Sequence, residues 1–254
     1  MSNTTKIALI TGGSRGLGKN MALRLAESGV DVVVTYHTKK EEAENVAAQI
    51  RQMGRKSAAM PLDMGDTAGL EPFLNQLAEI LQTGFGRSTF DFLINNAGMG
   101  ATVPIAQVTE ELFDRFLNVH FKNIYFLTQR ALPMMADGGR VINISTGTTR
   151  FCVPGYSVYA SMKGAVETFT KYLAKEIGVR GMTANVLAPG PVETDFNNAA
   201  IRSNPQTKTF LSNASALGRV GEPDDIGGVV AFLCSDAARW INGQRIEASG
   251  GINL

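Results

Sequence analysis

Cysteine, histidine and tryptophan are scarce in this sequence of 254 residues, which has 2 Cys, 2 His and 1 Trp. The two histidines, His37 and His120, cannot form a multi-histidine metal site, so we expect no metal. Cys152 and Cys234 lie far apart, in neither a metal nor a redox spacing. We therefore predict reduced, buried thiols and a cytoplasmic protein.

Long apolar runs and an excess of charge of one sign are also absent. No run approaches the roughly 20 apolar residues that span a bilayer, and the first six residues lack the apolar core of a signal peptide. Lys plus Arg number 24 against 23 Asp plus Glu, which gives a net charge of +1. The longest basic run, Lys39-Lys40, is followed at once by two glutamates. We therefore expect neither a membrane nor a nucleic acid as a partner.

Short apolar runs alternate with helical patterns along the whole chain. Because parallel neighbours need a helical crossover and these strands are apolar on both faces, the pattern predicts a doubly wound α/β fold. We expect a single domain, residues 1–254, of about seven parallel strands with helices on both faces. Strands are predicted at 6–11, 32–36, 57–61, 90–94, 141–145, 183–187 and 244–248, and helices at 18–27, 41–53, 70–81, 110–135, 157–177 and 224–234.

One segment breaks this alternation. Residues 191–221 are polar and rich in Asn, Ser and Ala, with isolated Phe196, Ile201 and Phe210. A long irregular segment in a compact domain is typical of a functional lid or of disorder. We interpret the segment as a lid over a substrate.

A glycine-rich segment, Thr11-Gly12-Gly13-Ser14-Arg15-Gly16-Leu17-Gly18, directly follows the first predicted strand. Gly12 permits a tight turn, Gly16 lets the backbone approach a pyrophosphate, and Gly18 lets helix and strand pack closely. The N-terminus of the next helix offers N–H groups and a positive dipole end to phosphates. The alternative is a turn without a ligand. The position between the first strand and the first helix favours a dinucleotide site.

The end of the second predicted strand indicates which dinucleotide is bound. An acidic residue there would hold the ribose 2′-OH of NAD and repel a 2′-phosphate. The sequence instead reads Tyr36-His37-Thr38-Lys39-Lys40, and Asp31 lies at the other end of the strand. Together with Arg15, these hydroxyls and cations favour NADP(H) over NAD(H). The alternative is that Arg15 and Lys39 are ordinary solvated cations.

Tyr159 and Lys163 are four residues apart in a predicted helix and therefore share one face of it. A phenol with a pKa of about 10 is a poor acid or base near neutrality, and a nearby ammonium is expected to lower that pKa. A reaction that moves a hydride must also move a proton, which such a phenol can supply. A surface pair without function is the alternative. The position after strand 141–145, in a chain with a nucleotide loop, favours catalysis.

These motifs, in this order, resemble those of the short-chain dehydrogenase/reductase family over essentially the whole chain. The matching segments are Thr11-Gly12-x-x-x-Gly16-x-Gly18, Asn95-Asn96-Ala97-Gly98, Asn118, Tyr159-x-x-x-Lys163 and Pro189-Gly190-x-x-x-Thr194. The pattern of glycine and proline in Gly218-Arg219-x-Gly221-x-Pro223 is similar to that of the 3-oxoacyl-acyl-carrier-protein-reductase-like members. The resemblance implies an NADP(H)-dependent oxidoreductase that reversibly reduces a carbonyl or oxidises an alcohol.

The resemblance also implies a role for each matching residue. Tyr159 would be the catalytic acid and base, and Lys163 would bind the nicotinamide ribose and lower the pKa of the tyrosine. Asn118 would hold a water that relays protons to Lys163, or it merely interrupts a helix. The implied cofactor contacts are Gly12, Ser14, Arg15, Gly16, Leu17, Gly18, Tyr36, His37, Thr38, Asp63, Met64, Asn95, Ala97, Gly98, Tyr159, Lys163, Pro189, Gly190, Val192 and Thr194.

One departure from the family pattern lies thirteen residues before the tyrosine. The family usually has a serine there, and this chain has Thr146. A threonine hydroxyl has the same donor and acceptor capacity, so we expect Thr146 to hydrogen-bond the substrate carbonyl. Ser145 is the fallback, although as the preceding strand residue it should point to the opposite face.

A second departure concerns the substrate. Reductases that dock an acyl carrier protein commonly have a basic residue shortly before the fifth strand, whereas the segment 131–139 has none and includes Asp137. One cation, Arg180, is thin support for carrier binding. We therefore expect a free small or medium carbonyl compound or alcohol, although a carrier protein remains an open alternative. Phe151, Val153, Phe196, Ile201 and Phe210 suggest an apolar pocket, or else simple core packing.

Two other kinds of protein are alternatives to this assignment. An α/β hydrolase is disfavoured because neither histidine lies in a triad pattern. A non-catalytic NADP(H)-binding sensor or scaffold is the main alternative, but it would not need the full set of Asn118, Thr146, Tyr159 and Lys163.

The resemblance also implies a homotetramer in which helices 110–135 and 157–177 pair between subunits. Aromatic side chains on these helices either form that contact or fill the chain's own core. They are Phe116, Phe121, Tyr125, Phe126, Phe169 and Tyr172.

Overall fold

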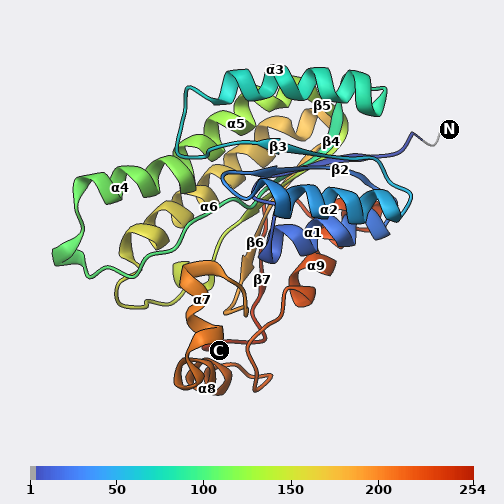
Figure 1. The fold of residues 1–254 in the computed structure, drawn as a ribbon. Helices are drawn as coiled ribbons and strands as arrows, with labels where there is room; N and C mark the ends of the chain where they lie inside the picture. The colour runs from blue at the N-terminus through green and yellow to red at the C-terminus, as the bar shows by residue number, and fades with distance from the viewer. Residues whose placement is uncertain (1–3) are drawn as a thin grey trace.

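The computed structural model describes residues 4–254, in which seven parallel strands form one sheet with helices on both faces (Figure 1). Residues 1–3, the start of the segment without a signal-peptide pattern, lie outside the described part. The order across the sheet is β3-β2-β1-β4-β5-β6-β7. The strands are β1 (Ile7–Ile10), β2 (Asp31–Tyr36), β3 (Ser57–Pro61), β4 (Phe90–Asn95), β5 (Met135–Ile144), β6 (Thr183–Pro189) and β7 (Arg245–Ala248). The predicted fold class is confirmed.

Successive residues of the central strands face opposite layers, as the pleat requires. Ile7 and Leu9 pack with α3 (Leu70–Ile80), α5 (Asn123–Ala131) and α6 (Ser157–Ile177). Ala8 and Ile10 pack with α1 (Gly16–Glu27), α2 (Lys40–Gln52) and α9 (Asp224–Cys234). Both faces of the sheet are therefore apolar, which explains the continuous hydrophobic runs in the sequence.

The direction of winding reverses between β1 and β4. The chain runs outward from β1 to β2 and β3, then crosses back to place β4 on the other side of β1. In such sheets ligands bind outside the carboxyl ends of the strands at this reversal. The glycine-rich segment follows β1 and Asn96-Ala97-Gly98 follows β4, so the fold brings both to this position.

The predicted helix 110–135 is interrupted. It consists of α4 (Glu110–Leu117), a π-helical turn over Asn118–Lys122, and α5, which ends at Ala131. The wider turn adds a residue to the helix and shifts the side chains that follow it. Pro133 lies in a 3-10 turn, and β5 begins at Met135 instead of 141, so the helix is shorter than predicted.

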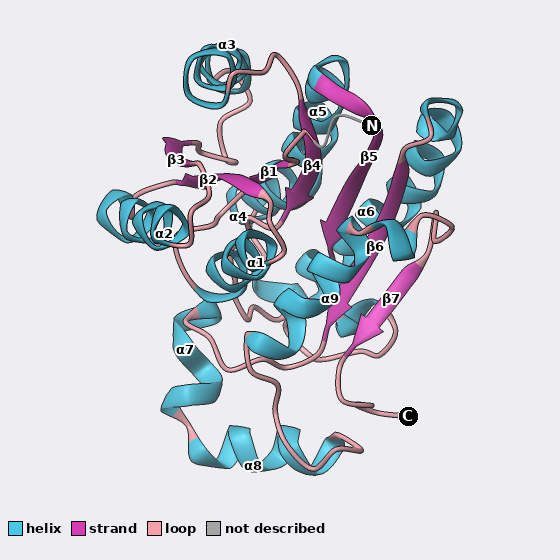
Figure 2. Cartoon of the chain, turned by 90° about the vertical axis from the view of Figure 1, so that its right-hand side faces the viewer, coloured by secondary structure: helices cyan, strands magenta, loops and turns pink. Residues whose placement is uncertain are grey.

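Residues 191–221 are helical, contrary to the expectation of an irregular segment. They form α7 (Phe196–Ser203) and α8 (Pro205–Ala214). Asn204 accepts a hydrogen bond from the backbone N–H of Thr207, 3.1 Å away, and Pro205 starts the helix, which is a favourable N-terminus that periodicity alone does not reveal. Figure 2 shows α7 and α8 beyond the ends to which the arrows of β5, β6 and β7 point.

One expectation about the thiols needs correction. Cys234 is buried in α9, as predicted, but Cys152 is exposed because it lies in the loop after β5 instead of in the core. In the described part of the chain, no helix combines the length and apolar character needed to cross a membrane.

Candidate active site

A cavity of about 1260 Å³ opens at the carboxyl ends of the strands, between the sheet, the loops after β4 and β5, and α7 and α8. It brings together all but two of the predicted site residues. The predicted residues in its wall are Gly12, Ser14, Arg15, Gly16, Leu17, Gly18, Tyr36, His37, Thr38, Asp63, Met64, Ala97, Gly98, Thr146, Tyr159, Lys163, Pro189, Gly190, Val192 and Thr194. Asn95 and Asn118 are not part of that wall.

Gly12 and Gly18 of the glycine loop leave no room for a side chain. Gly12 has φ +68°, and a Cβ there would lie 2.9 Å from Cα of Ala97. A Cβ on Gly18 would lie 2.2 Å from the Gly12 carbonyl oxygen. The loop is tied to the segment after β4, since the Thr11 hydroxyl accepts from the backbone N–H groups of Asn96 and Ala97, both at 3.0 Å. The backbone can therefore approach a pyrophosphate closely at the N-terminus of α1.

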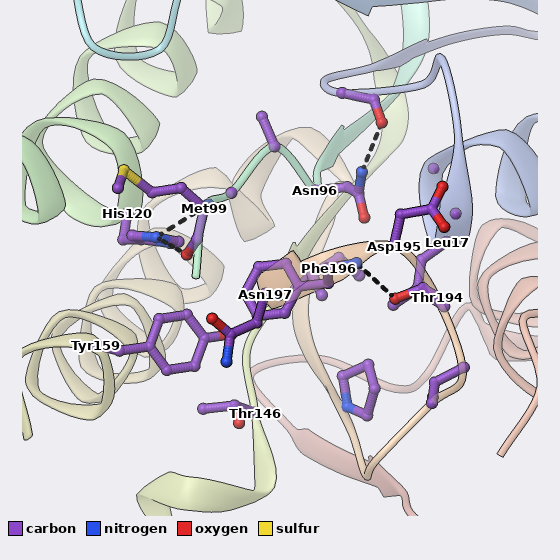
Figure 3. Close-up of a pocket in the computed structure, with 18 of the residues that line it drawn as sticks. Leu17, Asn96, Met99, His120, Thr146, Tyr159, Thr194, Asp195, Phe196 and Asn197 are labelled. Carbon is purple, nitrogen blue, oxygen red and sulfur yellow. Dashed lines mark hydrogen bonds between the residues drawn. The ribbon is translucent and has the colours of Figure 1, made fainter. Parts of the chain in front are cut away.

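The side chain of Asn95 is directed away from the cavity. It is fully buried, and its Nδ2 donates to Asn143 Oδ1 at 2.8 Å and to the Thr128 hydroxyl at 3.0 Å. As the last residue of β4 it points into the core. Its neighbour Asn96 lines the cavity instead (Figure 3). The Asn96 Nδ2 donates to the carbonyl oxygen of Thr11 at 2.9 Å. The Asn-Asn pair in the sequence did not indicate which member faces the ligand.

The end of the cavity beyond β2 is formed by charged and polar side chains. Arg15, His37, Thr38 and Lys39 line it, and Asp63, from the loop after β3, lies with its Oδ2 3.4 Å from Nε2 of His37. Cations and a hydroxyl at the carboxyl end of β2 suit a ribose 2′-phosphate. Together with the glycine cradle, the residues present fit NADP(H).

At the other end of the cavity lie Thr146, after β5, and Tyr159 of α6 (Figure 3). Lys163 follows Tyr159 one helical turn later on α6 and also lines the cavity. Lys163 is only 3% exposed, and its Nζ donates to the carbonyl oxygen of Ile144 at 2.7 Å. Nζ lies 5.9 Å from the centre of the Tyr159 ring. The Thr146 hydroxyl accepts from the backbone N–H of Thr148 at 3.2 Å, which fixes its place in the loop.

The electrostatics differ from the prediction that Lys163 lowers the pKa of Tyr159. In the chain itself, removal from water raises the pKa of Tyr159 above its usual value, and hydrogen bonding to Thr146 opposes this only in part. Burial lowers the pKa of Lys163 to about 8, and Glu167 opposes that shift. Burial is the main cause of the shift at the phenol, and Lys163 Nζ lies 5.9 Å from the centre of its ring. Tyr159 is therefore fully protonated at neutral pH, the form that a proton donor needs.

Ser145, the fallback for Thr146, is engaged elsewhere. Its hydroxyl donates to Glu167 Oε1 at 2.6 Å, and the same oxygen accepts from Thr149 and Arg245. Ser145 is buried, which agrees with its opposite orientation on the strand. Thr146 is therefore the hydroxyl better placed for a substrate.

Asn118 begins the π-helical turn, and its carbonyl oxygen accepts from the backbone N–H of Asn123. Reasoning from the sequence missed His120, two residues later in that turn. His120 is fully buried, its ring stands at 89° to that of Tyr159 with centroids 5.0 Å apart, and its Nε2 lies 2.8 Å from the Met99 carbonyl oxygen (Figure 3). Burial and the charge of Lys163 hold the pKa of His120 well below its usual range, so the ring is neutral.

The segment from Gly12 to Gly16 also has the G-x-S-x-G spacing of a hydrolase nucleophile elbow, centred on Ser14. In residues 4–254, Ser14 makes no hydrogen bond to either histidine. His37 faces Asp63 and His120 faces the Met99 backbone. The geometry therefore lacks the nucleophile and base pair that a hydrolase requires.

The remaining wall, above Tyr159, is largely apolar. Phe196 of α7 lies with its ring centre 6.1 Å from that of Tyr159. Most of these residues were missed or left open because they are dispersed along the chain and resemble ordinary core or loop residues. They are Met99, Phe151, Val153, Tyr156, Phe196, Asn197, Ile201, Phe210 and Leu211.

Comparisons with known proteins give relatives over nearly the whole chain. Residues 12–253 match the family model described as Enoyl-(Acyl carrier protein) reductase. Versicolorin reductase 1 of Aspergillus parasiticus is 37% identical, with 97% of this chain and 95% of that protein covered.

Two solved structures are similar along nearly their whole length. The promiscuous reductase LugOII, which catalyses keto-reduction at C1 during lugdunomycin biosynthesis, is 38% identical with a TM-score of 0.93, and all of both chains is covered. The angucycline C-6 ketoreductase LanV, solved with bound NADP, is 39% identical with a TM-score of 0.94, covering 99% of this chain and 97% of that one. The chain is a member of the short-chain dehydrogenase/reductase family and an NADP(H)-dependent oxidoreductase.

Proposed function

We propose that this protein reversibly reduces the carbonyl group of a free, apolar ring ketone with NADPH. The observation that carries the proposal is the placement of Thr146 and Tyr159, two hydroxyl groups beside a buried lysine, between the NADP(H)-fitting end of the cavity and an aromatic wall. Flat rings suit that wall, since Phe151, Phe196 and Phe210 line it. Versicolorin reductase 1 and the angucycline C-6 ketoreductase LanV, both named as reductases, support carbonyl reduction by this site.

The roles of the residues follow from their chemistry. NADPH, when bound, supplies the hydride. Thr146 and Tyr159 donate hydrogen bonds to the carbonyl oxygen, which stabilises the developing alkoxide. Tyr159 then transfers its proton to that oxygen, and because its pKa is raised it holds the proton until the oxygen becomes strongly basic. Lys163 binds the nicotinamide ribose, and the π-turn at Asn118 orders the water that returns a proton.

The segment 191–221 acts in this proposal as a lid. Phe196, Asn197, Ile201, Phe210 and Leu211 place the inner surfaces of α7 and α8 in the cavity wall. The backbone of Val192 pairs with that of Gly221, so the two ends of the segment are held together. A segment anchored at its base and open at its tip can move without disturbing the sheet.

The test is to follow the absorbance of reduced nicotinamide with NADPH or NADH and a panel of aryl ketones, diketones and 3-oxo esters. We expect ketone-dependent oxidation of NADPH, fastest with the aryl ketones, and little oxidation of NADH. Tight NADPH binding without oxidation by any ketone would contradict the proposal and favour a non-catalytic sensor. Fastest turnover of 3-oxoacyl esters of an acyl carrier protein would contradict the free substrate.

We also propose that the protein is a cytoplasmic homotetramer. Tyr125 on α5 and Tyr172 on α6 are 38% and 68% exposed, so part of the aromatic set is accessible to a second subunit, while Phe116 fills the chain's own core. Light scattering after size exclusion tests the assembly. A monomer at micromolar concentration would contradict it.

A further inference from the structure

Tyr156 is a second phenol in the cavity that the proposed reaction does not use. It immediately precedes α6 and lies three residues before Tyr159, a spacing that puts both side chains on one face. Their ring centres are 6.2 Å apart at an angle of 76°. Both residues line the cavity, and Tyr156 contributes with burial to the raised pKa of Tyr159.

Asn197 of the lid fixes the direction of the Tyr156 hydroxyl. Its Nδ2 donates to the Tyr156 oxygen at 2.9 Å and to the Thr102 hydroxyl at 3.3 Å. The Tyr156 oxygen therefore acts as an acceptor toward the lid. Among the described side chains, which leave out that of Asn198, no acceptor is found for the hydrogen of that hydroxyl, so Tyr156 retains one donor toward them.

The neighbouring backbone holds this arrangement in place. A Cβ on Gly100 would lie 2.8 Å from Cβ of Asn197, and a Cβ on Gly155 would lie 2.6 Å from Cγ2 of Thr102. The backbone N–H of Val103 donates to the Gly155 carbonyl oxygen at 2.9 Å. Three segments, the loop after β4, the loop before α6 and the lid, therefore meet around the Tyr156 hydroxyl.

We propose that Tyr156 donates a hydrogen bond to a second oxygen of the substrate, distinct from the reacting carbonyl. The substrate class is thereby narrowed to ring ketones that carry another oxygen, such as a ring hydroxyl or a second carbonyl. The inference rests on the proposed function. The reacting carbonyl already has two donors, Thr146 and Tyr159, which suffice for its two lone pairs. Asn197 strengthens the third donor by polarising it from the lid side.

The test compares α-tetralone with the four tetralones that carry one hydroxyl on the aromatic ring. We expect the wild-type protein to have a higher kcat/KM with at least one hydroxylated isomer than with α-tetralone. In Tyr156→Phe this ratio of kcat/KM values should fall about tenfold. The kcat/KM of the same variant with α-tetralone should stay within about twofold of the wild-type value. Asn197→Gly, chosen because φ at Asn197 is +52°, should remove a smaller part of the preference. Tyr172→Phe, an exposed tyrosine on the same helix, is the matched control and should change nothing.

Binding of the same ketones to the protein loaded with NADP⁺, measured by calorimetry, separates this inference from the proposed function. Tighter binding of a hydroxylated isomer that is lost in Tyr156→Phe supports the second oxygen site, even if no ketone is reduced. No ketone-dependent oxidation of NADPH would contradict the proposed function alone. An equal loss for all tetralones in Tyr156→Phe would assign Tyr156 to the reacting carbonyl and overturn the inference. No effect on any of them would overturn it as well.

Discussion

The two ends of the cavity are built in different ways. The cofactor end is made from short contiguous segments, the glycine loop from Gly12 to Gly18 and the residues from Tyr36 to Lys39, each at the end of one strand. The reaction end is assembled from the π-turn, the loop after β5, α6 and the lid, which are far apart in the sequence. The first end is open and charged, and the second is aromatic and contains a buried lysine.

This difference explains which substitutions each end tolerates. In the proposed function, backbone groups and exposed cations hold the ligand at the cofactor end, so single side chains should contribute modestly to binding. A few buried groups at the reaction end would act directly on the reacting atoms, so their removal should affect the rate strongly. The predictions below test that contrast.

Tyr159→Phe should have the largest effect. It removes the proton donor but keeps the ring that packs against His120 and Phe196. We expect kcat for ketone reduction to fall about 10³-fold, within the range for a lost general acid. NADPH affinity, measured by fluorescence titration, should stay within about threefold, because the cofactor end is untouched. Turnover close to that of wild type would contradict the role of Tyr159.

Gly18→Ala should be the most damaging change at the cofactor end, through shape instead of charge. The new Cβ would lie 2.2 Å from the Gly12 carbonyl oxygen and 2.6 Å from Nδ2 of Asn96. Displacement of the loop should cost about 1–3 kcal/mol in the free energy of unfolding, measured in urea. NADPH binding should weaken as well.

Gly164→Ala is the control for that change. A Cβ at Gly164, within α6, meets nothing within 4 Å. The free energy of unfolding of this variant should rise by about 0.5–1 kcal/mol, because alanine favours the helix more than glycine does. If both alanine variants had the same stability, the tight packing of the glycine loop would be refuted.

The same contrast determines what the sequence could predict. The doubly wound fold and the glycine loop follow from local patterns, namely apolar runs, helical periodicity and three glycines at one strand end. Tyr159 and Lys163 were predictable because one helical turn joins them. His120, Tyr156 and Asn197 were not, since their roles arise only where the π-turn, the α6 N-terminus and the lid meet.

Two features of the site could not be predicted, for the same physical reason. A motif does not show which of two adjacent strand residues has its side chain in the core, and here that residue is Asn95. The pKa of Tyr159 was expected to fall because the sequence shows a neighbouring lysine. It does not show the carbonyl oxygen of Ile144 that binds Nζ, or the burial that dominates at the phenol.

Lys163→Met should abolish rapid turnover and yet stabilise the fold. The pKa of Lys163 is about 8 in the folded chain, against an ordinary value of 10.5. Below pH 8 the lysine is charged in both states, and burial of that charge lowers the stability of the folded chain. Removing it should raise the free energy of unfolding at pH 7 by about 1–2 kcal/mol, after allowance for the lost hydrogen bond to Ile144.

The pH dependence provides a second check on the lysine. As pH rises from 8 toward 10.5, the unfolded wild-type chain binds a proton that the folded chain does not, so wild type gains stability. The difference in the free energy of unfolding between Lys163→Met and wild type, measured in urea titrations, should therefore shrink over this interval. A Lys163→Met variant that is less stable than wild type at pH 7 would contradict this prediction. It would show that the contacts of the buried ammonium outweigh the cost of burying its charge.

Arg15→Gln should have the smallest effect of these substitutions. It tests how much the charge of Arg15 contributes to NADPH affinity at the cofactor end. Arg15 lines the cavity but is half exposed, and its Nη1 lies 3.8 Å from Oδ2 of Asp195, which also pairs with Arg202 at 2.9 Å. A solvated cation contributes little, so NADPH affinity should fall about three- to tenfold while NADH affinity stays unchanged. Arg202→Gln breaks the other ion pair of Asp195 without touching the cavity wall, and it should leave both affinities as they are. An equal loss for NADPH and NADH in Arg15→Gln would mean that Arg15 holds the pyrophosphate or the lid instead of the 2′-phosphate, and the discrimination would then lie with His37 and Lys39.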